Sequence, residues 1–280
     1  MNIAIFAFVC LSVACSTADT LQELDYDWAN IKSRDLYVEP IGPAPEQQSG
    51  LRIIGGNVAA RGAFPYQAAL IIDNQSFCGG SIISNQWVLT AAHCVDTAAA
   101  VQIILGAHNP RSTVNEPTQV RLAANGRVVH TGWETSVLQN DIALLRVASI
   151  PVGQPGISAV NLAPSNSPTY AGSTGTISGW GRTSDASTTI ANELKFVEVP
   201  IISNLICTLS YGPLVSSQHV CTSGAGTRGA CNGDSGGPLV VAGVEIGIVS
   251  FGSRLCESGN PSVFVRVSHF RDWITSNSGV

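Results

Sequence analysis

Residues 233–238 read GDSGGP, a serine on a glycine-rich turn with a carboxylate immediately before it. A serine hydroxyl is a poor nucleophile at neutral pH unless a neighbouring base removes its proton. Its attack on a carbonyl also creates an oxyanion, which needs preorganised N–H donors. The small residues around Ser235 let the amides of Gly233 and Ser235 approach such an oxygen closely. The turn therefore predicts a nucleophile only if the chain also supplies a base and an orienting acid.

Two further segments supply that base and that acid. Residues 90–94 read TAAHC, and His93 comes just after a predicted buried strand. Residues 141–145 read DIALL, which places Asp141 at the start of another apolar run. A single histidine or aspartate in such a place is usually a hydrogen-bonded structural group. The three segments together predict Ser235 as nucleophile, His93 as general base and then acid, and Asp141 as the group that fixes the imidazole tautomer.

These motifs, together with SGWG at residues 178–181, follow one another in an order typical of one enzyme family. From about Ile53 to Trp273 the sequence resembles the chymotrypsin/trypsin family of serine endopeptidases. That family is the reference system for the Ser-His-Asp mechanism, so the mechanism is carried over with the resemblance. The resemblance implies peptide hydrolysis through an acyl-enzyme, an oxyanion hole at Gly233 and Ser235, and no cofactor or metal.

Short β-rich runs, broken by turn signals, fill the chain after Ile53 and favour an antiparallel sandwich or barrel. The predicted strands are 67–72, 81–89, 101–105, 142–147, 175–178, 193–199 and 244–250. A final helix is predicted over residues 267–276. Phe270, Trp273 and Ile274 would share its buried face.

The resemblance narrows this pattern to an all-β fold of two antiparallel six-stranded β-barrels, with the active site between them and a C-terminal helix. The first barrel would span about 53–159 and contain His93 and Asp141. The second would span about 160–280 and contain Ser235. The pattern alone does not distinguish two barrels from one sandwich.

Residues 1–18 have the composition of a secretory signal peptide. They are apolar as far as Ala14 and end in STA, a small-x-small cleavage pattern. The segment is too short to favour a membrane span, and no later segment is long and apolar enough for one. Its start lacks Lys and Arg, which departs from the usual pattern. We expect a secreted, extracellular protein, with the gut lumen as one destination.

Cysteine usage agrees with secretion. Cys10 and Cys15 would be removed with the signal peptide, which leaves six cysteines for an oxidising compartment. Spacing alone cannot choose among the pairings that six cysteines allow. The resemblance implies the pairs Cys78–Cys94, Cys207–Cys221 and Cys231–Cys256. The sequence has no C-x-x-C or H-x-x-x-H cluster, so it predicts no zinc site.

Residues 19–52 form a polar leader with seven acidic and three basic residues. The leader contains most of the formal net charge of −5, so the remaining chain is nearly neutral. A nucleic-acid partner therefore has no electrostatic support. Residues 41–50 have the composition of a linker. The leader has no cysteine, so no disulfide would hold it after cleavage.

The leader ends at RIIGG, residues 52–56, which resembles the family's activation junction. Cleavage after Arg52 would create an ammonium group on Ile53, and the resemblance implies that this group pairs with Asp234. A buried carboxylate needs such a partner. Residues 19–52 are thus predicted to be the activation propeptide of a zymogen, and residues 53–280 the protease domain.

The substrate pocket is assigned by the same resemblance. Its residues would be Gly229 at the floor, Ser250, Phe251 and Gly252 along the wall, and Ser262 at the back. None of them supplies the buried carboxylate that an Arg or Lys side chain requires, and Glu257 is expected outside the floor. Gly252 leaves the entrance open, which favours Phe, Tyr, Leu or Met before the scissile bond. Ser250 is also expected to bond Asp141, and its backbone to pair with the substrate strand.

Such a pocket resembles those of chymotrypsin-like enzymes and of brachyurins, the serine collagenases. Brachyurins often have an aspartate where this chain has Ser262, so their broad, partly basic-tolerant specificity does not follow. Elastase-like cleavage after small residues is the alternative. Whether collagen is cut stays open.

Two surface features complete the prediction. Asn74 begins an N-x-S sequon in an expected exposed loop, and its occupancy is left open. The loop that binds calcium in some relatives runs here from Gly106 to Glu116. Ala107 replaces its first acidic ligand, so no calcium site is predicted.

The expected partners are protein or peptide substrates, a trypsin-like activating protease and protein protease inhibitors. The enzyme is expected to be a monomer, with no nucleic-acid or membrane partner. One alternative is an inactive homologue that acts in binding, although His93, Asp141 and Ser235 are all present. Another is a narrow cascade protease; a leader without cysteines favours a digestive enzyme instead.

Overall fold

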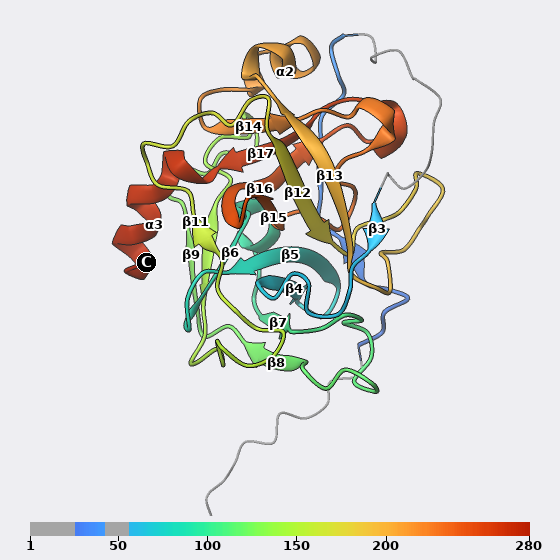
Figure 1. The fold of residues 1–280 in the computed structure, drawn as a ribbon, viewed down its shortest axis with the longest axis vertical. Coiled ribbons are helices and arrows are strands. Elements are labelled where there is room, and N and C mark those ends of the chain that lie inside the picture. The colour runs from blue at the N-terminus through green and yellow to red at the C-terminus, as the bar shows by residue number, and fades with distance from the viewer. Residues whose placement is uncertain (1–25, 43–55) are drawn as a thin grey trace, which may run out of the picture.

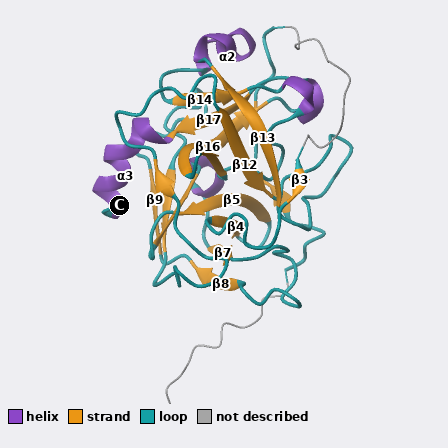
Figure 2. Cartoon of the chain, viewed as in Figure 1, coloured by secondary structure: helices purple, strands orange, loops and turns teal. Residues whose placement is uncertain are grey.

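The computed structural model describes residues 26–42 and 56–280 (Figure 1). The predicted signal peptide and the junction residues Arg52 and Ile53 lie outside the described residues. Two β-sheets lie one above the other, and the helices α2 (Asn204–Tyr211) and α3 (Arg271–Ser278) lie at the periphery (Figure 2).

The first sheet closes into a barrel. Its strands are β4 (Gln67–Ile72), β5 (Ser76–Ile82), β6 (Trp87–Thr90), β7 (Val101–Leu105), β8 (Val120–Ala123), β9 (Gly126–Val129) and β10 (Ala143–Arg146). They pair in the order β8-β7-β4-β5-β6-β10-β9, and every pair is antiparallel. Only Ala124 and Asn125 separate β8 from β9, so these two act as one bent strand that completes a ring of six.

The second sheet also closes. Its ring consists of β12 (Thr174–Gly179), β13 (Lys195–Ile202), β14 (His219–Thr222), β15 (Pro238–Val241), β16 (Val244–Gly252) and β17 (Ser262–Arg266). Antiparallel pairing runs β12-β13-β14-β17-β16-β15 and returns to β12. Short strands β3 (Asn57–Val58) and β11 (Asn161–Leu162) add to β13 and β16. The expected pair of antiparallel six-stranded barrels is confirmed.

Three helices complete the elements: α1 (Ala92–Val95), α2 (Asn204–Tyr211) and α3 (Arg271–Ser278). The Ser203 side chain caps α2 by accepting from the Ile206 amide. The predicted C-terminal helix begins as a 3₁₀ turn, Val267–Phe270, before α3. Phe270 and Ile274 are buried as expected. Within the described ranges, no helix has the length and hydropathy that a membrane span requires.

One predicted strand is wrong. The sequence predicted a single strand over 81–89, whereas β5 ends at Ile82 and β6 begins at Trp87. The Ile83 amide bonds the Trp87 carbonyl, which closes a turn between the two strands. Apolar residues on both sides of the polar Ser84-Asn85-Gln86 stretch made the two strands look continuous.

The largest apolar cluster extends through both barrels and includes Leu70, Leu145 and Phe264. Two buried hydrogen bonds also join the barrels. Ser81 donates to the Glu245 carboxyl at 2.7 Å, and Ser178 donates to the Gln67 side-chain oxygen at 2.6 Å. These contacts fix the two barrels against each other beside the cleft that holds the predicted site.

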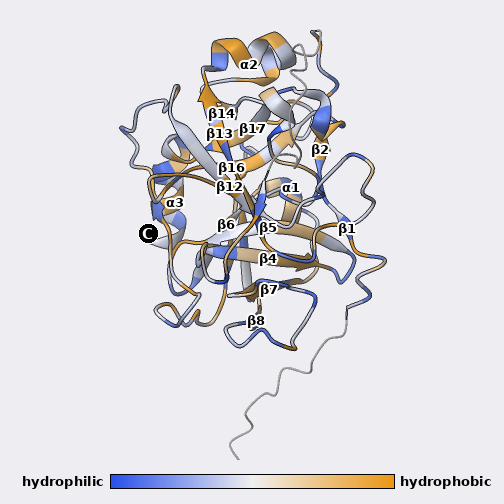
Figure 3. Ribbon diagram, turned by 45° about the vertical axis from the view of Figure 1, so that its right-hand side comes forward, coloured by the Kyte–Doolittle hydropathy of each residue, from blue (hydrophilic) through white to orange (hydrophobic). Residues whose placement is uncertain are grey.

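The leader contacts both barrels. Its strand β1 (Lys32–Ser33) pairs with β5 of the first barrel, and β2 (Leu36–Tyr37) pairs with β16 of the second. Both pairings are parallel. Figure 3 shows β1 and β2 one after the other along the same side of the molecule. The leader therefore crosses the boundary between the barrels at the level of the predicted active site.

Candidate active site

The predicted base and acid form a buried pair in the first barrel. His93 lies on α1, and Asp141 lies two residues before the start of β10. His93 Nδ1 lies 2.8 Å from Asp141 Oδ2, and the His93 backbone amide donates to Asp141 Oδ1 at 2.9 Å. Ser250 on β16 donates a third hydrogen bond to the same carboxylate at 2.6 Å. The carboxylate thus fixes the orientation of the imidazole ring.

The two groups alter each other's ionisation. Burial alone would raise the pKa of Asp141, but the neighbouring His93 and the Ser250 hydroxyl lower it below its usual value. Burial is also the strongest effect on His93 and disfavours its charged form. The Asp141 carboxylate, helped by the leader, nevertheless raises the pKa of His93 above its usual value. The pair therefore favours a carboxylate beside an imidazole that accepts a proton readily.

The predicted nucleophile lies on the turn before β15. Ser235 is 4% exposed, and its turn packs against the first barrel, where the Gly79 amide bonds the Ser235 carbonyl at 2.7 Å. Gly236 has a φ of +79°, and a Cβ there would lie 2.3 Å from the Thr90 hydroxyl. The glycine after the nucleophile is thus required both by the backbone conformation and by the close approach of the two barrels.

Asp234, on the same turn, points away from the cleft. Its carboxylate accepts hydrogen bonds from the Gly181 amide at 2.8 Å and the Cys231 amide at 3.0 Å. Within the described part of the chain no ion pair forms with it. Burial, only partly offset by the two amides, raises the pKa of Asp234 to about 6. Asp234 lines a cavity together with Gly56, the first described residue after the junction.

A second cavity adjoins Ser235. It includes the predicted pocket residues Ser250, Phe251, Gly252 and Ser262. From the protease domain it is further lined by Ala230, Cys231, Asn232, Val249, Ser253 and Cys256. All of these side chains are uncharged, and Glu257 is not among them. No atom outside its immediate neighbours lies within 4 Å of a Cβ built on Gly252, so the wall is open there.

The predicted floor residue, Gly229, borders two cavities. It lines the Asp234 cavity, and a Cβ built on it would lie 2.8 Å from the hydroxyl of Ser262, which lines the cavity beside Ser235. The Ala230 amide donates to the same hydroxyl at 3.3 Å, and Ala230 also lines the cavity beside Ser235.

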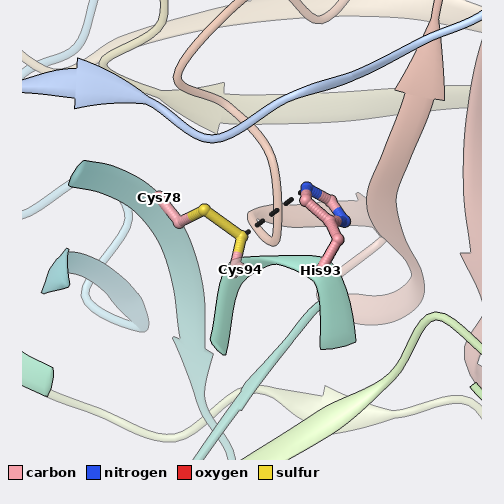
Figure 4. Close-up of side chains that lie close together, drawn as sticks. All are labelled: Cys78, His93 and Cys94. Carbon is pink, nitrogen blue, oxygen red and sulfur yellow. Dashed lines mark hydrogen bonds between the residues drawn. A yellow bond between two sulfur atoms is a disulfide. The ribbon is translucent and has the colours of Figure 1, made fainter. Parts of the chain in front are cut away.

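The structure contains the three disulfides that the resemblance implies: Cys78–Cys94, Cys207–Cys221 and Cys231–Cys256. The first joins β5 to the helix that bears His93, with Cys94 Sγ 3.7 Å from His93 Nε2 (Figure 4). The third joins the nucleophile turn to the far side of the pocket. Two groups of three metal-ligand types occur in the described residues, and each contains one of these disulfides. Disulfide sulfurs are not thiolate ligands, so neither group resembles a metal site.

The two surface predictions fall on ordered loops. Asn74 is exposed in the turn between β4 and β5. Glu116 accepts from the amides of His108 and Asn109, at 2.8 and 3.0 Å, and pairs with Arg61 at 2.9 Å. Arg61 thus places a cation beside the acidic end of the loop where some relatives bind calcium.

Sequence reasoning missed the leader residues at the site, among them Asp35 and Arg34. Asp35 Oδ1 accepts from the Gly233 amide at 3.0 Å and from the Ser235 hydroxyl at 3.1 Å. The Arg34 carbonyl lies 3.2 Å from His93 Nε2. Nothing in the composition of a polar leader distinguishes these two residues from their neighbours, because their role depends on where the chain crosses the cleft.

Known proteins agree with this geometry. The trypsin family model matches residues 53–274. A brachyurin from Leptuca pugilator is 44% identical over 229 residues, which cover 81% of this chain and 99% of the relative. A chymotrypsin from Phaedon cochleariae is 37% identical, with coverage of 88% and 89%. A solved structure titled HL collagenase superposes with a TM-score of 0.73 at 33% identity, covering 81% of this chain and 99% of the other. The chain therefore belongs to the trypsin family of serine proteases.

Proposed function

We propose that this serine protease is a secreted endopeptidase, made as a zymogen, that cleaves after large apolar or aromatic residues. The observation on which this specificity rests is that every protease-domain side chain lining the cavity beside Ser235 is uncharged; the charged residue in its lining, Asp35, belongs to the leader. A pocket without a carboxylate leaves the charge of a bound Arg or Lys uncompensated, which disfavours trypsin-like cleavage. Relatives named brachyurin, chymotrypsin and collagenase support a chymotrypsin-like or collagenolytic enzyme.

We assign the catalytic roles by the mechanism of the family. Ser235 attacks the scissile carbonyl while His93 accepts its proton and later protonates the leaving amine. Asp141, with three hydrogen bonds, holds the imidazole and stabilises its charged form. The amides of Gly233 and Ser235 stabilise the oxyanion.

Activation depends on Asp234. Cleavage after Arg52 by a trypsin-like protease would free the Ile53 amine, and Gly56, three residues further along the chain, lines the same cavity as Asp234. An ammonium there would compensate the buried carboxylate and lower its raised pKa. We further propose an extracellular monomer that acts on proteins in the gut lumen and is controlled by protein inhibitors.

The test is to cleave the purified chain after Arg52 and profile it on peptides that vary the residue before the scissile bond. We expect Phe, Tyr, Leu and Met to dominate, and an organophosphorus reagent to label Ser235. Dominant Arg or Lys cleavage would refute the pocket assignment, and dominant Ala or Val cleavage would favour the elastase-like alternative. An unlabelled Ser235 would favour an inactive homologue that acts in binding.

A further inference from the structure

We propose that leader residues 26–42 are an active-site inhibitor of this protease, bound in the substrate cleft in the direction opposite to a substrate. The inference rests on the proposed function, since it assigns an occupant to the same cleft. In the leader, Asp35 contacts the nucleophile, Arg34 contacts the base and Tyr37 lines the substrate pocket.

Asp35 engages the nucleophile, Ser235, in a hydrogen bond. One carboxylate oxygen accepts hydrogen bonds from both the Gly233 amide and the Ser235 hydroxyl. This carboxylate oxygen therefore lies where the oxyanion of a reacting substrate would accept a hydrogen bond from the Gly233 amide. A carboxylate is a poor electrophile, so Ser235 has a charged hydrogen-bond acceptor before it and no carbonyl that it can acylate.

The backbone of Arg34 contacts the base, His93. Its carbonyl lies 3.2 Å from His93 Nε2, the nitrogen that must accept the serine proton. A carbonyl only accepts, so this contact holds a proton on Nε2, while Nδ1 faces the Asp141 carboxylate. The single hydroxyl proton of Ser235 is directed to Asp35 instead. The leader thus separates the nucleophile from its base by bonding each one elsewhere.

Tyr37 gives the direction of the chain. It lines the pocket and contacts the Asn232 side chain at the pocket wall. In a protein cleaved after its pocket residue, the residues that follow that residue must cross the nucleophile. Here Arg34 and Asp35, which precede Tyr37, lie at the base and the nucleophile, while the Val38 amide bonds the Gly252 carbonyl further along the wall. The leader therefore presents no cleavable bond to Ser235.

Contacts on both sides of the site hold the leader in this position. Before the site, Tyr26 and Ile31 are buried in an apolar cluster with Phe77 and Trp180. Beyond the site, Leu36 and Val38 pack against the cluster that contains Tyr211 and Phe251.

Arg34 adds polar contacts through its side chain, which donates to the Cys94 carbonyl and the Thr97 hydroxyl, both at 2.8 Å. These contacts do not involve residues 43–55. A cut after Arg52 therefore leaves them intact, and activity requires that the severed leader also dissociates.

The experiment uses the full chain with residues 48–52 replaced by an enteropeptidase site that ends before Ile53, so that cleavage spares Lys32 and Arg34. After complete cleavage we expect low activity on a small substrate at high protein concentration. Activity should rise at least about 10-fold on dilution or after gel filtration removes the leader fragment. Mass spectrometry should find that fragment uncut while it is bound.

The decisive variant is Asp35→Ala, which removes a charged acceptor from two hydrogen bonds and should weaken retention of the fragment about 10- to 100-fold. Asp27→Ala is the matched control, because Asp27 is exposed and its side chain bonds only Asn30 of the leader. Equal release from both variants, cleavage of the bound fragment after Tyr37, or activity independent of dilution would each overturn the proposal. Retention on gel filtration tests the leader even if the protease proves inactive, so the two failures are distinguishable.

Discussion

Two buried aspartates flank the cleft, and they differ in what compensates their charge. Asp141 accepts three hydrogen bonds, one from the ring of His93, and these contacts lower its pKa. Asp234 accepts two backbone amides, and burial raises its pKa to about 6. In the described chain, the charge of Asp141 is therefore already compensated by its hydrogen-bond partners. The charge of Asp234 is not, and an added cation would stabilise it. The difference supports the proposal that activation acts on the turn and not on the base.

The largest expected effect comes from Asp141→Asn in the processed enzyme. An amide in this position favours the wrong imidazole tautomer, so kcat should fall about 10⁴-fold, the size typical of serine protease triads. Steady-state kinetics on a peptide substrate measures this loss. A loss below about 10-fold would show that His93 does not depend on Asp141.

Asp234→Asn should lower the activity of the processed enzyme about 10²- to 10³-fold, because the new ammonium of Ile53 would lose its charged partner. The unprocessed chain should not lose stability in proportion, since there the buried carboxylate lacks a cationic partner and is neutral below about pH 6. Activity after cleavage and denaturant unfolding before cleavage test the two statements. Full activity of the variant would refute the proposed switch.

Alkaline pH should reverse activation without any mutation. An Ile53 amine stabilised by Asp234 has a pKa above the ordinary 7.7–8.0 of a chain terminus, and the ion pair is present below that pKa. Above it, activity should fall about 10-fold per pH unit as the amine loses its proton. A pH–rate profile of the processed enzyme measures the decline, and acetylation of the terminus is expected to abolish activity at every pH.

Ser250→Ala removes one of the three hydrogen bonds to Asp141 and leaves the other two. We expect about a 10- to 100-fold loss of kcat, because one hydrogen bond to a charged group contributes about 1.5–3 kcal/mol. The loss should be far smaller than that of Asp141→Asn. A comparable loss would mean that Ser250, rather than His93, sets the ionisation of the carboxylate.

A third buried carboxyl, Glu245, should affect stability and not activity. Burial raises its pKa to about 8, partly offset by the hydrogen bond from Ser81. The folded state therefore holds a proton that the unfolded chain has lost, and the free energy of unfolding falls by about 1.4 kcal/mol per pH unit between the two pKa values. Glu245→Gln should remove this contribution, so urea unfolding at pH 5 to 8 should show a shallower pH dependence for the variant than for the unmodified protein.

Local features of the fold can be predicted from the sequence more completely than its long-range contacts. The bounds of Gln67–Ile72 followed directly from an apolar run between turn signals. The turn after Ile82 was missed because its polar stretch, Ser84-Asn85-Gln86, is short and has apolar residues on both sides. The order of the motifs predicts that His93, Asp141 and Ser235 belong to one site. The position of Gly229 relative to the pocket depends on the direction of the Ser262 side chain, which no linear pattern encodes.

The contacts of the leader with both barrels have a consequence for the order of events during synthesis. Residues 26–42 emerge before either barrel, but their hydrogen bonds require β5 from one barrel and β16 from the other. The complete set of these bonds can form only when the two halves have docked, which also brings His93 to the turn that bears Ser235. Docking of the two barrels therefore completes both the catalytic centre and the binding site of its proposed inhibitor.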